Sequence, residues 1–161
     1  MKNNYIADAS LLISLKHSHM SLSDSLRAQF ESLHENNQHE EILTLAKEQT
    51  ITPENQIELK TYVGRALNNL GRLKEALTYL LEVDQLEQES NAATKYRIAY
   101  AYAFLDQLKE AEAYVAACLA LDAEFPYADE ITDIIRERKA YLNSFLGSGN
   151  VDNSLPDRGR E

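Results

Sequence analysis

The four histidines are the side chains best suited to metal binding or proton transfer. His17 and His19 are two residues apart, whereas His34 and His39 are five apart. Side chains two apart on a helix diverge by about 200°, and a five-residue step across a turn fixes no ligand geometry. No cysteine or acidic cluster completes either pair. We therefore interpret these histidines as solvated and expect neither a metal nor a cofactor.

Cys118, the single cysteine, is the other candidate for chemistry. It follows Ala117 in a pattern typical of a helix core, with no histidine at helical spacing. A free cysteine at such a position commonly packs as a small apolar side chain. The carboxylates lie on polar helix faces, where no pair is placed to act as acid and base. We therefore expect the protein not to be an enzyme.

The chain is acidic, with 26 Asp and Glu against 16 Lys and Arg and a net charge of −10. Such a chain repels phosphate backbones, so we expect no nucleic-acid ligand and a protein partner with basic character. No window approaches 18 apolar residues, which argues against a membrane span. One cysteine and no signal-peptide pattern favour the cytoplasm, although the periplasm is also compatible.

A repeat organises the helical pattern. Seven residues beginning at Leu70 recur at Leu105, which is 35 residues later, and a weaker copy beginning at Asn37 aligns with Gly71, 34 residues later. In each copy a small or apolar residue is followed twelve positions later by another: Phe30 and Ile42, Gly64 and Ala76, Ala99 and Ala111. Apolar stripes at three- and four-residue steps predict two helices per copy.

The second copy carries the clearest boundary signals. Thr52 and Pro53 predict a helix start, with Thr52 as the N-cap, and Gly71 predicts its end in a left-handed turn. The small residues Gly64 and Ala76 should let the two helix axes of this copy approach closely.

This period, with two helices per unit, resembles the tetratricopeptide repeat. The resemblance rests on ten positions in two units: Gly64, Leu67, Leu73, Ala76, Leu80, Ala99, Tyr102, Leu108, Ala111 and Val115. It implies an all-α fold in which about three helix-turn-helix repeats form a right-handed superhelical stack.

The resemblance covers residues 22–125, which we take as the repeat domain. The spacing of apolar residues over 126–146 predicts a capping helix, whose apolar face includes Ile131, Ile135, Leu142 and Phe145. Residues 1–21 form an N-terminal segment with a possible extra helix, and residues 147–161 read as a disordered tail.

An aromatic stripe on the third unit is the main candidate for binding. Tyr96, Tyr100 and Phe104 are four residues apart and lie off the core stripe of the same helix. The resemblance places the first helices along a concave groove. That groove would present the stripe together with Arg65, Asn68, Asn69 and Arg97. Alternatively, the stripe packs on the terminal helix through Tyr127 or Ile131, and both arrangements remain open.

We therefore expect an adaptor or chaperone-like module that binds a partner segment in this groove. One use within the family is not expected: Glu31 and Ala93 replace residues that would grip the C-terminal carboxylates of heat-shock chaperones. Two alternatives remain. One is a homo-oligomeric scaffold, such as a homodimer formed through residues 6–15. The other is an immunity or inhibitor protein that blocks a toxin.

Overall fold

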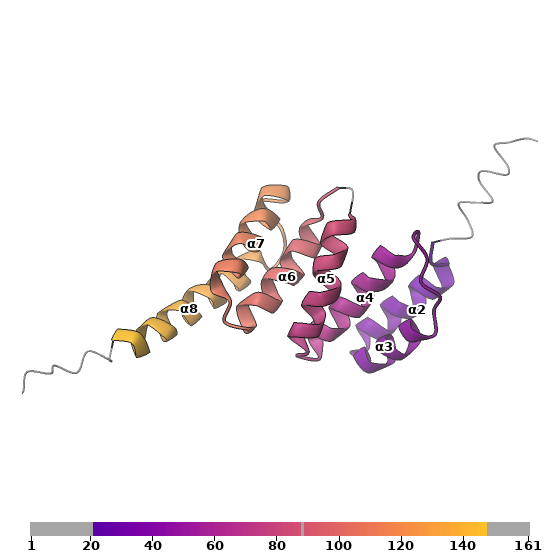
Figure 1. Ribbon diagram of the computed structural model, residues 1–161, viewed down its shortest axis with the longest axis horizontal. Helices are drawn as coiled ribbons and strands as arrows, with labels where there is room; N and C mark the ends of the chain where they lie inside the picture. Colours follow the sequence, from indigo (N-terminus) through magenta and orange to yellow (C-terminus); the bar gives the residue numbers. More distant parts are fainter. Residues whose placement is uncertain (1–20, 88, 148–161) are drawn as a thin grey trace, which may run out of the picture.

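The computed structural model describes residues 21–87 and 89–147, and in these ranges it is all-α. The described helices are α2 (Asp24–Glu35), α3 (His39–Lys47), α4 (Gln56–Asn69), α5 (Leu73–Leu86), α6 (Ala92–Phe104), α7 (Leu108–Leu121) and α8 (Ala128–Gly147). Each helix packs on the next, and the pairs form a row along the long axis (Figure 1). This confirms the predicted stack of three helix pairs with a seventh helix. Of the N-terminal segment expected over residues 1–21, residues 1–20 lie outside the described residues. The tail expected over residues 147–161 also lies outside them, except for Gly147, which ends α8.

The first helix of every unit ends in the same backbone turn. Asn37, Gly71 and Asp106 have φ values of 57°, 71° and 59°. In each turn the N–H of the following residue donates to a carbonyl five residues earlier: Gln38 to Leu33 at 2.8 Å, Arg72 to Leu67 at 2.9 Å, and Gln107 to Tyr102 at 3.0 Å. Glycine tolerates this left-handed conformation best, followed by Asn and Asp. The backbone therefore repeats at the period that the sequence predicts.

Small side chains let α4 and α5 approach closely. A Cβ atom added at Gly64 would lie 2.6 Å from Leu80 Cγ, well inside normal contact. Ala76 is fully buried on the opposite helix. In the first unit Phe30 and Ile42 fill the positions equivalent to Gly64 and Ala76, and α2 and α3 contact each other less than α4 and α5 do.

The predicted start of α4 is wrong. The helix begins at Gln56 rather than after Thr52. The side chain of Asn55 accounts for the delay, since Oδ1 accepts the Thr52 N–H at 2.8 Å and Nδ2 donates to the Thr50 carbonyl at 2.9 Å. These bonds hold the chain in a turn before the helix begins.

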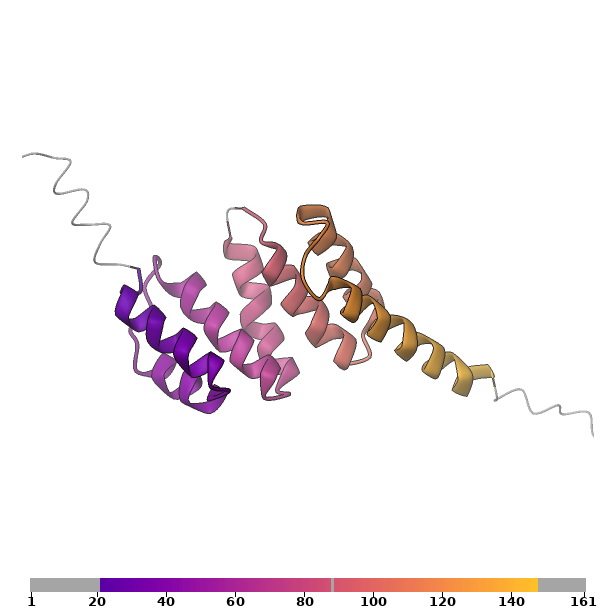
Figure 2. The same cartoon turned by 180° about the vertical axis from the view of Figure 1, so that it is seen from behind.

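The capping helix α8 makes its buried apolar contacts with α6 and α7 through its first half. Ala128, Ile131 and Ile135 are buried there. The second half extends past the end of the stack (Figure 2), and Leu142 and Phe145 are 37% and 60% exposed. The predicted apolar face of this helix is therefore buried at Ile131 and Ile135 and exposed at Leu142 and Phe145. None of the described helices meets the length and hydropathy that a membrane crossing requires.

Candidate functional site

A concave pocket of about 630 Å³ lies along the first helices of the three units. Its lining residues are His34, Asn37, His39, Arg65, Asn68, Asn69, Ala93, Tyr96, Arg97, Tyr100, Phe125 and Tyr127. Of the seven predicted site residues, only Phe104 is missing from this lining. Residues from α2, α4 and α6 thus meet at one surface, together with the segment that precedes α8.

Aromatic rings form one side of the pocket. The Tyr96 ring centroid lies 5.4 Å from that of Phe125 and 6.4 Å from that of Tyr127. Tyr100 contacts Phe104 at 4.6 Å between centroids, and the guanidinium of Arg138 in α8 lies 4.8 Å from the Phe104 centroid. Both arrangements considered for the stripe are therefore present. Tyr96 and Tyr100 line the pocket, and all three rings also pack against the cluster that contains Ile131 and Ile135 of α8.

Two arginines form the other side. Arg65 Nη1 pairs with Glu31 Oε2 at 3.3 Å. Arg97 makes no ion pair with any residue that the structure describes. Burial lowers the pKa of Arg97, and the nearby charge of Arg65 lowers it further. An arginine still remains charged at physiological pH, because its ordinary pKa is so high.

Asn68 joins the two arginine-bearing helices. Its side chain is buried, and Nδ2 donates to the backbone carbonyl of Arg97 at 2.9 Å. Within residues 21–87 and 89–147, the Oδ1 atom has no hydrogen-bond partner. A buried acceptor without a donor is costly, and because this atom has almost no accessible surface, a bound donor would reach it only after neighbouring side chains shift.

His34 and His39 face each other across the Asn37 turn, with ring centroids 5.4 Å apart. Both are partly buried, and their Nδ1 atoms are buried without a partner in the described part of the chain. Burial, followed by the charge of Arg65, lowers the pKa of His34. The interpretation of these two as solvated is wrong, because the left-handed turn folds α3 back beside α2.

Of the remaining candidates for chemistry, the structure describes only Cys118. His17 and His19 lie outside the described residues. Cys118 is buried in α7, and burial raises the pKa of its thiol, as expected for a structural cysteine. In the described ranges no three His, Cys, Asp or Glu side chains gather as metal ligands.

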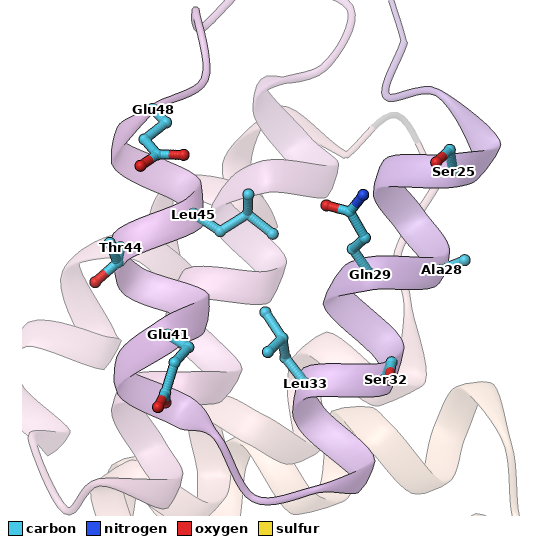
Figure 3. Close-up of a pocket in the computed structure, with 9 residues that line it drawn as sticks. All are labelled: Ser25, Ala28, Gln29, Ser32, Leu33, Glu41, Thr44, Leu45 and Glu48. Carbon is cyan, nitrogen blue, oxygen red and sulfur yellow. The ribbon is translucent and has the colours of Figure 1, made fainter.

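A second cavity, of about 670 Å³, lies between α2 and α3 at the end of the described stack (Figure 3). Leu33, Leu45 and the polar Gln29 point into the space between the helices, while the other polar side chains lie at its edges. Ser25 in α2 is exposed, whereas its equivalent in α4, Leu59, is buried. This cavity contains none of the predicted site residues, so the pocket along the first helices is the better candidate site.

Comparison with known proteins supports the repeat directly. Residues 92–125 match the family model described as tetratricopeptide repeat. The matched segment contains α6 and α7 and includes Tyr96, Arg97 and Tyr100. Comparisons with curated proteins and with solved structures gave no match. The match shows one tetratricopeptide repeat at α6 and α7, and two further helix pairs stack beside it at the same period.

Proposed function

We propose that this protein is an adaptor or chaperone-like module that holds a segment of a partner protein in the pocket along α2, α4 and α6. Tetratricopeptide repeats generally mediate protein–protein interactions rather than catalysis. The observation that carries the proposal is the pocket itself, which combines aromatic rings with polar side chains on one concave face.

In this proposal Tyr96 and Tyr100 are the apolar anchors. Tyrosine provides a large contact area with a polar end, and it is enriched at protein interfaces. Arg65, Asn69 and Arg97 lie beside these rings and would contact the polar groups of the bound segment. Asn68 would accept a hydrogen bond through its unpaired Oδ1 atom.

The net charge of −10 supports a partner whose overall surface is basic, because the surface charge steers the encounter at long range. This overall charge is separate from the chemistry of the segment that enters the pocket. We also propose a cytoplasmic location.

Affinity capture from the native host, followed by mass spectrometry, tests the proposal. The Tyr96→Ala/Tyr100→Ala variant should lose the partner, with binding weakened by about 2 kcal/mol or more. A matched control removes an exposed tyrosine elsewhere, Tyr79→Ala, and should retain it. Because Tyr96 and Tyr100 are partly buried, urea midpoints must be measured alongside. A loss of stability as large as the loss of binding would refute the anchor role.

A homo-oligomeric scaffold is the second candidate, and the far end of α8 favours it. Tyr141 and Phe145 contact each other at 4.7 Å between centroids, and both are more than half exposed. Size-exclusion chromatography with light scattering on the full chain, on Tyr141→Ser/Phe145→Ser and on a chain starting at Met20 tests for a homodimer and for the segment that forms it. A monomeric full chain would exclude the scaffold. An immunity or inhibitor protein would also act by binding a partner. Recovery of a toxin in the affinity capture would identify that role.

A further inference from the structure

The charge of the pocket lining is opposite to that of the whole chain. The chain has 26 acidic residues among 161, yet none of the twelve lining residues is acidic. Two of the twelve are arginines and two are histidines. Two acidic residues outside the lining act on the arginines: Glu31 pairs with Arg65, and the charges of Glu31 and Glu87 both act on Arg97. The pocket is therefore a cationic site on an acidic protein.

Arg97 is the lining arginine that makes no ion pair in the described part of the chain. Burial and the nearby charge of Arg65 lower its pKa, whereas the charges of Glu31 and Glu87 act in the opposite direction. Like charges held together in a partly buried site repel each other, and a bound anion relieves that repulsion. Arginine also offers a planar set of donors that matches a carboxylate.

Asn68 narrows the class of ligand further. Its side chain is only 6% exposed, and the free Oδ1 atom needs a donor. A carboxylate has no hydrogen to donate, whereas the N–H of a peptide bond has one. A peptide that carries a carboxylate satisfies both Asn68 and Arg97.

The aromatic side of the pocket adds a third requirement for the ligand, which is an apolar group. Tyr96, Tyr100, Phe125 and Tyr127 lie next to Arg97 in the lining. Tyr127 is 67% exposed, so its ring is available to a ligand. An apolar side chain adjacent to the acidic one would cover these rings.

We propose that the pocket recognises an internal acidic segment of the partner. In this segment an Asp or Glu carboxylate binds Arg97 and Arg65, a backbone N–H donates to Asn68, and a neighbouring apolar side chain packs on Tyr96 and Tyr100. The inference rests on the proposed function and specifies its ligand.

Three pools of octapeptides test the inference. All have acetylated and amidated ends, so that no terminal charge contributes. A central position is fixed as Glu, Gln or Lys, and the other positions are mixed apolar and neutral residues. Binding of the full chain to fluorescent pools is measured by anisotropy. The Glu pool should bind at least ten times more tightly than the other two.

Variants connect that preference to the pocket. Arg97→Gln should reduce the preference for Glu over Gln to less than twofold. Arg65→Gln, which changes a more accessible side chain, provides a second test if Arg97→Gln folds poorly. Arg136→Gln is the matched control, because Arg136 is an exposed cation on α8 outside the pocket. It should leave the preference unchanged. Circular dichroism and urea midpoints verify the fold of each variant.

The possible outcomes separate the inference from the proposed function. Equal binding of the three pools, or a preference for Lys, would overturn the acidic ligand while leaving a peptide-binding module intact. A Glu preference that survives both arginine variants would also overturn it. Release of the Glu pool by an equal concentration of inorganic phosphate would assign the pocket to a small anion. If no pool binds and affinity capture finds no partner, the proposed function itself fails.

Discussion

The contact between Gly64 and Leu80 allows a quantitative test of the repeat packing. Gly64 corresponds to Ala99 in the next unit, and Leu80 corresponds to Val115, each 35 residues later. The second unit thus pairs the smallest residue with a large one, and the third pairs two of intermediate size. We infer that the volume at this helix contact is similar in the second and third units, while its division between the two helices varies.

The substitution Gly64→Ala adds volume on the α4 side of this contact without removing any on the α5 side. The new Cβ atom would lie 2.6 Å from Leu80, whereas ordinary contacts are 3.4–4 Å, and Leu80 has no exposed surface into which it can move. Overpacking costs about 1–3 kcal/mol, and the higher helix propensity of alanine offsets about 1 kcal/mol of it. A net loss of about 1 kcal/mol corresponds to a urea midpoint lower by about 0.5 M.

Leu80→Val should compensate, because it recreates the pair found in the third unit. Alone, this change removes a buried methylene group and should cost about 1 kcal/mol. The double variant Gly64→Ala/Leu80→Val should instead be within about 0.5 kcal/mol of the original protein, which means the two changes are strongly coupled. Urea unfolding of all four proteins measures the cycle. A double variant whose loss equals the sum of the single losses would refute the reasoning.

Three further predictions concern stability. Gly71→Ala should cost about 1–2 kcal/mol in urea unfolding through backbone strain alone, because φ is +71° and nothing lies within 4 Å of the added Cβ. Ala111→Leu should cost about 1–3 kcal/mol by overpacking a fully buried site, and an unchanged midpoint would count against the repeat register. His34 has a lowered pKa in the folded protein, so the unfolded chain binds its proton first and stability should decrease as the pH falls below about 6.5. His34→Gln should reduce that decrease, and identical pH profiles would contradict the assignment. The charged groups that act on His34 are Arg65, His39, Glu31 and Arg97.

The sequence predicts the helix pairs because their signals are local. Apolar side chains at helical spacing, small residues at the helix contact and a glycine at the end of α4 all act within a few residues of their position in the chain. The turn at Gly71 could be predicted from its residue type. Asn37 and Asp106 adopt the same conformation, and only their alignment with Gly71 indicates it.

The sequence does not predict features that depend on where distant segments meet. The pairing of His34 with His39 follows from the direction of the Asn37 turn, and helical spacing rules assume that no turn intervenes. The exposure of Phe145 has a similar origin. The apolar stripe of α8 continues along the helix, but the stack beneath it ends.

The register of the repeat also explains why the pocket has a chemical character of its own. Positions that face the neighbouring helix remain small or apolar from unit to unit, because close packing restricts them. Positions along the concave face are free of that restriction, and they change completely. One such position is Glu31, Arg65 and Tyr100 in successive units, and the Arg65 and Tyr100 side chains line the pocket. The repeating core therefore holds the first helices at a fixed spacing, while the side chains along their concave face differ from unit to unit. In the proposed function, the order of charge and aromatic character in that row, rather than the fold, would determine which segment binds.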